Sequence, residues 1–450
     1  MIILNTQKRI AAFCVLGLVL ILINCSTTAE TLQESKIHDM EFVLVAGKTP
    51  TPTPTPIPER NTSTAEGLGI ILEDSWKLSG DLGLGRWGHT ATILDNGSVL
   101  VVGGSKRLSY RASAENQAKL MPFGHDEWFP AGTPNWERTY HTATLLPDGR
   151  VLVVGGSGRA TWQDDGESKV FSGIKDLFSS EIYEPNTNEW IETSEMSYKR
   201  SRAQAITLEG GDVLIIGGRS GVDIADTTEI YRVKTGIWEE STPMNHRRMS
   251  HSAIKLKDGR VLVTGGLESV VPGETLASAE VYDPNTKTWI VANKMHYARL
   301  GHQSTLLSDG RVIITGGATA LEPESKDQYP GISAEIYDPD SDQWTEVSNM
   351  DFPRQDHVAL LISEVIGGFS HKDKVILFGG ANQLGSGITV VEEYDVTDNE
   401  WSRITRLPEG RTLLTATLME DCSVLIVGGG DVSRTGDNFP EYTLRFTTDC

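Results

Sequence analysis

Short apolar runs rich in β-branched residues recur along most of the chain, and seven of them end in a pair of glycines. Residues 151–156, VLVVGG, are typical, and they follow a polar Asp-Gly turn. A run of this length between turn signals predicts a buried strand. An alternating segment such as residues 141–146, HTATLL, precedes the turn, and a segment such as residues 279–284, AEVYDP, follows the glycines. We therefore expect repeated units of short antiparallel strands joined by tight turns, named a to d in chain order.

Three further residue types recur at regular positions relative to these runs, which indicates one repeated unit. The glycine pairs are Gly103-Gly104, Gly155-Gly156, Gly217-Gly218, Gly265-Gly266, Gly316-Gly317, Gly379-Gly380 and Gly428-Gly429. A tryptophan marks the expected strand d at Trp76, Trp128, Trp190, Trp238, Trp289, Trp344 and Trp401. Ten residues after each tryptophan stand Arg86, Arg138, Arg200, Arg248, Arg299, Arg354 and Arg411. Three residues further on stand His89, His141, His251, His302 and His357, with Ala203 and Leu414 in the other two units.

The combined pattern resembles kelch repeats. The spacing of about 50 residues, the glycine pair, and a tyrosine seven residues before the tryptophan carry this resemblance, which covers residues 67–450. It implies an all-β, seven-bladed kelch β-propeller of the galactose oxidase-like type, with four antiparallel strands in each blade. The glycines are expected to let an aromatic ring approach the backbone. Because the last unit lacks a tryptophan strand, we expect residues 70–78, with Trp76, to complete the seventh blade and close the ring.

The N-terminus predicts export and membrane attachment. Lys8 and Arg9 precede an apolar run at residues 10–23, which would be about 21 Å long as a helix and is therefore short for a bilayer span. The run ends in residues 22–25, LINC, which resemble a bacterial lipobox with Cys25 as the lipid-modified residue, although Asn24 departs from the usual small residue. An uncleaved membrane anchor is the alternative.

The sequence predicts three regions along the chain. Residues 1–24 are the signal peptide, residues 25–66 a lipid-attached Thr/Pro-rich tether with polyproline character, and residues 67–450 the propeller. We expect an extracytoplasmic monomer, lipid-anchored to the bacterial cell membrane. In that oxidising setting Cys422 and Cys450, which lie at the ends of two neighbouring strands of the last blade, are expected to form a disulfide.

The charge of the chain argues against one class of partner. With 40 Lys and Arg residues against 61 Asp and Glu residues, the formal net charge is −21. A field of this sign repels polyanions, so nucleic acid is excluded as a partner.

The alternation of strand directions places the starts of strands a, the b–c loops and the d–a loops at one face of the ring. The candidate ligand-binding residues at this mouth are Arg86, His89, Arg138, Tyr140, His141, Arg248, His251, Arg299, His302, Arg354 and His357, with Trp162 on the long b–c loop of the second unit. An alternative for the arginines is pairing with an acid nine residues before the tryptophan, at Glu181, Glu229, Glu280, Glu335 and Glu392. The first unit has Lys119 at that position, which makes Arg138 a candidate for an unpaired arginine. An insertion at residues 363–374 is expected at the opposite face.

Tyr140 and His141 resemble the consecutive Tyr-His copper ligands of galactose oxidase. That family also needs a cysteine cross-linked to a second tyrosine, and the chain has no cysteine between Cys25 and Cys422. We therefore expect no radical copper site, no cofactor, no metal site and no catalytic residue. A loose zinc or copper site made by several mouth histidines is the alternative.

The function that fits these features best is that of a surface-displayed binding module, with a glycan or protein held by the d–a and b–c loops. A carbohydrate-acting enzyme of the sugar oxidase or sialic-acid mutarotase kind rests on the resemblance alone. A purely structural envelope component is the third possibility.

Overall fold

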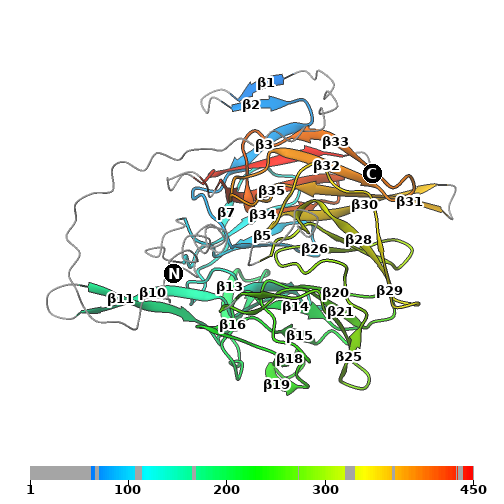
Figure 1. Cartoon of the computed structure of the whole chain (residues 1–450). Coiled ribbons are helices and arrows are strands. Elements are labelled where there is room, and N and C mark those ends of the chain that lie inside the picture. The colour runs from blue at the N-terminus through cyan, green and yellow to red at the C-terminus, as the bar shows by residue number, and fades with distance from the viewer. Residues whose placement is uncertain are drawn as a thin grey trace, which may run out of the picture.

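The computed structural model describes residues 62–65, 70–106, 114–164, 169–271, 273–319, 330–366, 370–431, 433 and 439–448. Seven four-stranded antiparallel sheets are arranged as the blades of a propeller (Figure 1). Blades are numbered here by the order of their repeat arginines, from Arg86 to Arg411. The predicted signal peptide, Cys25 and nearly all of the tether lie outside the described residues. In the described part of the chain no helix is long and apolar enough to cross a membrane.

Blades 1 to 6 each use four strands that follow one another along the chain. Blade 1 contains β4 (Thr90–Ile93), β5 (Val99–Val102), β6 (Ala118–Met121) and β7 (Phe129–Pro130). Blade 2 contains β8 (Thr142–Leu145), β9 (Val151–Val154), β12 (Ser180–Glu184) and β13 (Glu189–Glu192). Blade 3 contains β14 (Gln204–Thr207), β15 (Val213–Ile216), β18 (Thr228–Arg232) and β19 (Ile237–Ser241). Blade 4 contains β20 (Ser252–Lys255), β21 (Val261–Thr264), β24 (Ala279–Asp283) and β25 (Thr288–Ala292). Blade 5 contains β26 (Gln303–Leu306), β27 (Val312–Thr315), β28 (Ala334–Asp338) and β29 (Gln343–Glu346). Blade 6 contains β30 (Val358–Ile366), β31 (Ser370–Phe378), β32 (Val390–Asp395) and β33 (Glu400–Arg406).

Blade 7 joins the two ends of the described chain, which confirms the predicted closure. It contains β34 (Thr412–Leu418), β35 (Ser423–Gly430) and β36 (Tyr442–Thr447), and its outer strand is β3 (Trp76–Asp81). Trp76 pairs with Phe446 in this ladder. The innermost strands contact one another in the order β4, β8, β14, β20, β26, β30 and β34, and β34 returns to β4. The ring is therefore complete.

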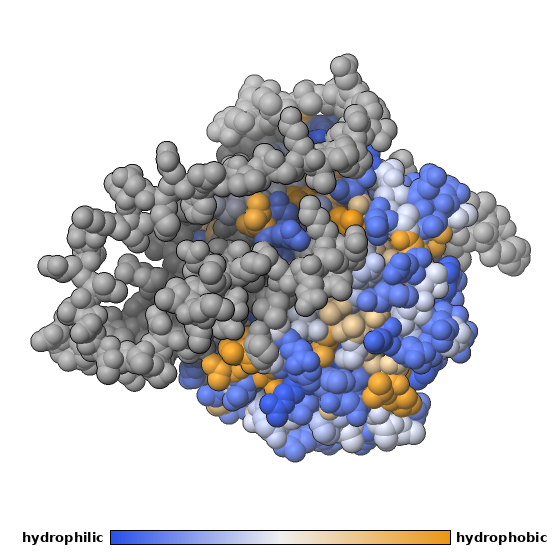
Figure 2. Space-filling model, viewed as in Figure 1, coloured by the Kyte–Doolittle hydropathy of each residue, from blue (hydrophilic) through white to orange (hydrophobic). Residues whose placement is uncertain are grey.

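The core lies between the blades. Strands b, such as β5 and β9, are buried at every position because each blade presents apolar side chains on both of its faces. Val151 and Val153 of blade 2, for example, pack in one cluster with Leu100 and Val102 of blade 1. Tyr183 packs against Trp190 with tilted rings, at 5.2 Å between ring centroids. Over the described surface in Figure 2, polar residues predominate and apolar side chains form separate small groups.

The glycine pair has a more specific role than the predicted approach of an aromatic ring. The second glycine of every blade donates its amide N–H to the carbonyl of the repeat arginine in the next blade, at 2.7–2.9 Å. A β-carbon on Gly103 would lie 2.3 Å from the Arg138 carbonyl oxygen and 2.9 Å from the His141 ring. Both the imidazole and the backbone of the next blade therefore require glycine here.

Several connections form small sheets of their own. The long b–c connection of blade 2 forms the hairpin of β10 (Ser157–Asp164) and β11 (Lys169–Asp176). The b–c loops of blades 3 and 4 form β16 (Arg219–Ser220) with β17 (Asp223–Ile224), and β22 (Leu267–Ser269) with β23 (Glu274–Thr275). The structure also contains the hairpin of β1 (Thr62–Ala65) and β2 (Ile70–Glu73), and a 3-10 turn, η3 (Pro330–Ile332). The blade 6 insertion lengthens β30 and β31 as a regular hairpin.

Candidate functional site

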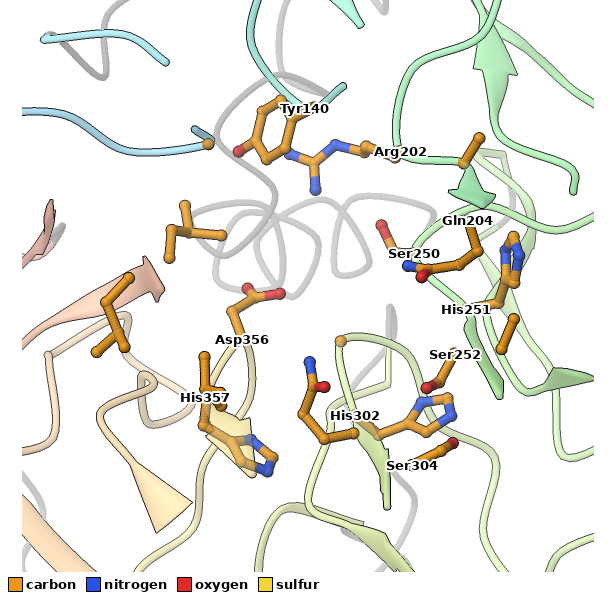
Figure 3. A pocket seen from close by; sticks show the side chains of 18 of the residues that line it. Tyr140, Arg202, Gln204, Ser250, His251, Ser252, His302, Ser304, Asp356 and His357 are labelled. Atoms are coloured by element: carbon orange, nitrogen blue, oxygen red, sulfur yellow. The ribbon is translucent and has the colours of Figure 1, made fainter. Parts of the chain in front are cut away.

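Seven residues form a ring around the axis of the propeller, one at the entrance to each innermost strand. They are Gly88, Tyr140, Arg202, Ser250, Gly301, Asp356 and Leu413. All seven have a left-handed backbone, with φ between 50° and 63°. Each immediately precedes the histidine position of its repeat. This conformation turns the chain sharply from the d–a loop into strand a. It also points the side chain of the ring residue toward the axis (Figure 3).

Backbone hydrogen bonds run around this ring from blade to blade. Tyr140 donates its amide N–H to the carbonyl of Gly88 at 2.8 Å, and Arg202 donates to Tyr140 at 3.0 Å. The series continues through Ser250, Gly301 and Asp356 to Leu413, at distances of 2.8–3.4 Å. The backbone of each ring residue from Tyr140 to Asp356 is therefore held by both neighbouring blades.

The ring surrounds a pocket of about 350 Å³ at the mouth of the axial channel. Its walls also include the first residues of strands a, among them Gln204, Ser252, Gln303 and Ser304. In Figure 3, Tyr140 and Arg202 lie side by side, and Asp356 points into the pocket from another blade. A cation, a carboxylate, a phenol, hydroxyls and carboxamides thus share one small space.

Arg202 and Asp356 carry the charges of this pocket. The Arg202 guanidinium lies over the Tyr140 ring, 3.6 Å from its centroid, which is a cation–π contact. Burial raises the pKa of the Asp356 carboxyl, and the positive charge of Arg202 opposes that rise. Burial also raises the pKa of Tyr140. Within the described residues no ion pair within 4.0 Å joins Arg202 to a carboxylate.

Several other polar groups of the pocket lack partners. The Ser250 hydroxyl is buried, and the structure gives it no hydrogen-bond partner. Asp356 accepts no hydrogen bond on its carboxylate from the part of the chain that the structure describes. Buried polar groups are normally satisfied, so these groups fit contact with a polar ligand or with water.

Four of the five mouth histidines form a hydrogen bond with a threonine of the preceding blade. The Nε2 to Oγ1 distances are 3.0 Å for His89–Thr415, 2.9 Å for His141–Thr90, 2.8 Å for His302–Thr264 and 2.9 Å for His357–Thr315. His251 has no such threonine, and its Nε2 is buried without a partner. Burial, followed by a nearby arginine, lowers the pKa of His89 and of His251 to about 3. These rings line the pocket wall as neutral groups that join blades.

The histidines do not converge on one point. Among the residues that the structure describes, no three His, Cys, Asp or Glu side chains are placed to hold a metal ion. The alternative of a loose metal site is therefore not supported by this part of the chain.

The repeat arginines stand behind the pocket wall. Their guanidinium groups are fully buried, and they are absent from the pocket lining. Four pair with strand c acids, with N–O distances of 2.6 Å for Arg138–Glu181, 2.9 Å for Arg200–Glu229, 2.7 Å for Arg248–Glu280 and 2.5 Å for Arg299–Glu335, and Arg354 pairs with Glu392. The geometry therefore supports the alternative of structural pairing over ligand contact for Arg138, Arg248, Arg299 and Arg354. Arg86 is buried away from the pocket as well, but no acid pairs with it in the described residues.

The expectation that Arg138 is unpaired is wrong, because Glu181 of its own blade binds it. The arginine beside Lys119 is Arg86, since each arginine reaches strand c of the blade that it begins. Trp162 lies in β10, and its side chain is outside the described part of the structure. Phe178, at the end of the same connection, packs against the core between blades 2 and 3.

Three pocket residues, Arg202, Asp356 and Gln204, are not among the candidate ligand-binding residues expected from the sequence. The signal that could have found Arg202 and Asp356 is the residue just before the histidine position, which differs in nearly every repeat while its surroundings recur. Gln204 follows that position, at the start of β14, and has no such signal. Arg202 is harder to recognise from the sequence because its repeat has Ala203 in place of the histidine.

Comparison with known proteins supports the repeat assignment. Residues 138–197 and 256–296 each match a kelch motif. Kelch-like protein 7 of Rattus norvegicus is 30% identical over 117 residues, which are 26% of this chain and 17% of that protein. Kelch-like protein 15 of Danio rerio is 24% identical over 165 residues, which are 37% of this chain and 23% of that protein. The matches thus span less than a quarter of these relatives.

Two solved structures are similar in fold. A fungal alcohol oxidase of the AA5 family, in complex with copper, superposes with a TM-score of 0.62 at 16% identity, over 83% of this chain and 76% of that chain. YjhT superposes with a TM-score of 0.52 at 14% identity, over 72% of this chain and 99% of that chain. At these identities the likeness concerns the fold alone.

The residues at the mouth do not fit the copper of the oxidase. His141 lies with Nε2 at 2.9 Å from the Thr90 hydroxyl, and its ring lies against Gly103. The Tyr140 ring packs at 5.2 Å from Trp87 and beneath Arg202. No cysteine that could modify a tyrosine occurs between Cys25 and Cys422. The chain therefore folds as a closed seven-bladed β-propeller, and two of its segments match kelch motifs.

Proposed function

We propose that this protein is a membrane-tethered, extracytoplasmic binding module that takes the terminal sugar of a glycan into its axial pocket. The observation that carries the proposal is the left-handed ring. Five of its seven positions hold side chains, at Tyr140, Arg202, Ser250, Asp356 and Leu413, although glycine suits this backbone best.

A left-handed residue other than glycine costs about 1 kcal/mol or more. Gly88 and Gly301 occupy the same ring position in blades 1 and 5, so the fold accepts glycine there. Strain that persists where a strain-free residue would fit is typical of a functional site. The five side chains therefore serve the pocket rather than the blade.

The chemistry of the pocket matches a sugar. Sugar hydroxyls both donate and accept hydrogen bonds, so they can use the guanidinium of Arg202 and the carboxylate of Asp356 together. The Tyr140 ring and Leu413 offer apolar surface beside these groups. A volume of about 350 Å³ is near the lower limit of ligand pockets, which suits one or two sugar rings.

The signal sequence, the Cys25 lipobox and the Thr/Pro-rich tether support display outside the cytoplasm. A propeller lifted from the membrane on such a tether would meet extracellular glycans.

A glycan array tests the proposal. The soluble chain from residue 62 onward should bind a limited set of oligosaccharides, and Arg202→Gln should weaken that binding at least about tenfold. Arg247→Gln is the matched control, because Arg247 is an exposed arginine outside the pocket lining. Absence of glycan binding, or equal binding by both variants, would overturn the proposal.

Catalysis on a carbohydrate is a second candidate, favoured by the raised pKa of Asp356. A pocket carboxyl with a raised pKa can exchange protons with a substrate. The test is the rate of anomer exchange of reducing sugars in proton NMR spectra. An acceleration that Asp356→Asn removes would establish catalysis, and no acceleration with any sugar that the protein binds would leave binding alone.

A further inference from the structure

The strand c acid is held in the same way in blades 2 to 6. Nη2 of the repeat arginine contacts the carboxylate, as in Arg138 with Glu181 at 2.6 Å. The carboxylate also accepts the amide N–H of the residue three positions before the arginine, as Glu181 does from Asn135 at 2.6 Å. The corresponding donors in the next blades are Ser197, Asn245, His296 and Asp351. Each of these five blades thus contains a buried anion site that its own glutamate fills.

Blade 1 keeps the arginine and lacks the acid. Lys119 pairs with Val101 in the ladder, as Glu181 pairs with Val153 in blade 2, so the lysine stands at the glutamate position. Arg86 still donates from Nη1 to the carbonyl of Gly103 at 2.9 Å.

The outer nitrogen of Arg86 has no partner. The residue is 0% exposed, and Nη2 makes no hydrogen bond. In the six other blades Nη2 of the repeat arginine contacts a carboxylate. Burial of this uncompensated charge lowers the pKa of Arg86 to about 10, and Glu115 opposes the change only in part.

Blade 7 shows that a missing acid can be replaced. Leu444 pairs with Ile426 there and so occupies the acid position. Glu409, two residues before Arg411, contacts Nη2 at 3.2 Å, and the Tyr442 ring lies 4.7 Å from the guanidinium carbon. The residue two positions before Arg86 is Leu84, which cannot do this.

We propose that blade 1 binds a small monovalent inorganic anion, of which chloride is the physiological example, at the position that glutamate fills in blades 2 to 6. The anion contacts Nη2 of Arg86, and the ammonium group of Lys119 adds a second positive charge. Two cations at a position built for a carboxylate favour an anion strongly, because a buried guanidinium is otherwise left without a counter-charge.

The first test compares thermal unfolding of the whole folded protein in sodium chloride and in sodium gluconate at equal ionic strength, since gluconate is too large for the site. The wild type should unfold at least about 2 °C higher in chloride. Lys119→Glu supplies the missing carboxylate, so it should unfold at the same temperature in both salts. Lys234→Glu makes the same charge change at an exposed residue of blade 3, and it should keep the chloride response.

The second test is the ³⁵Cl NMR linewidth of chloride, which needs no variant. Wild-type protein should broaden the line, and unlabelled bromide should reverse the broadening by competition. Equal unfolding temperatures of the wild type in the two salts, no broadening, or a chloride response that survives in Lys119→Glu would overturn the proposal.

Discussion

The amide nitrogen of Gly429 lies 2.8 Å from the carbonyl oxygen of Arg86, and this hydrogen bond joins the last blade to the first. The same contact joins each of the other neighbouring blades, from Gly104 with Arg138 to Gly380 with Arg411. Together with the pairing of β3 and β36, it closes the ring at a point where the two strands come from opposite ends of the chain. The glycine pair is therefore a connection between blades.

Gly429→Ala should lower the free energy of unfolding by about 2 kcal/mol or more. Its β-carbon would lie 2.7 Å from the Leu414 β-carbon and 2.8 Å from the Thr412 carbonyl oxygen, at a φ of 73°. Urea unfolding measures the change. Gly221→Ala is the control, since Gly221 has a similar φ of 64° and open space around it, so it should lose only about 1 kcal/mol. Equal losses would show that the close approach of β34 to Gly429 within blade 7 contributes nothing.

Glu280→Gln should destabilise the protein by about 3–5 kcal/mol, because it leaves the buried Arg248 without its counter-charge. Asp258→Asn removes an exposed carboxylate from Arg260 and should change stability by less than about 1 kcal/mol. Chemical denaturation of both variants provides the comparison. A Glu280→Gln variant as stable as the wild type would mean that the Arg–Glu pairs do not hold the blades.

Stability should fall as the pH drops below about 6.5. The pKa of each mouth histidine is lowered in the folded protein, mainly by burial, to about 3 for His89 and His251. The unfolded chain therefore binds protons that the folded protein does not, so the stabilisation is complete above the unfolded pKa and is lost toward acid pH. Each histidine contributes up to about 1.4 kcal/mol per pH unit.

Urea unfolding at pH 7.5, 6.5 and 5.5 measures this slope before most carboxyl groups titrate. His251→Gln should reduce the slope, and the same change at the exposed His125 is the control. A stability that is constant between pH 7.5 and 5.5 would contradict neutral, buried histidines.

Much of the fold could be predicted because the repeat residues stand at fixed intervals along the sequence. Ten residues from Trp to Arg recur in all seven units, and this interval located every blade, including the one that Trp76 completes. The Arg–Glu alternative also came from spacing, because strand c returns to the face from which the arginine enters.

The pocket could not be predicted in the same way. Arg202 and Asp356 face the axis because their φ values are 55° and 50°. Their residue types do not predict a left-handed backbone. Tyr140 was singled out as the residue before His141 that resembles a copper ligand, but the variation at this position in the other repeats was not taken as the sign of a pocket. The repeat arginines were expected at the mouth, but their guanidinium groups are buried within the blades and do not line the pocket.

The disulfide between Cys422 and Cys450 stays a prediction, because Cys450 lies outside the described residues. Cys422 directly precedes β35, and β36 ends three residues before Cys450. Peptide mapping by mass spectrometry without reductant should find the two cysteines linked. Recovery of both as free thiols from protein secreted into an oxidising compartment would reject the bond.

The left-handed ring offers the most direct test of the account, through Asp356→Gly. Glycine already stands at this ring position in blades 1 and 5, and it relieves both the left-handed strain and the burial of a charge. The account predicts that this variant is more stable than the wild type by about 1 kcal/mol at neutral pH and loses glycan binding on the array. A variant that is less stable and binds glycans as the wild type does would contradict it, because Asp356 would then serve the fold and not the pocket.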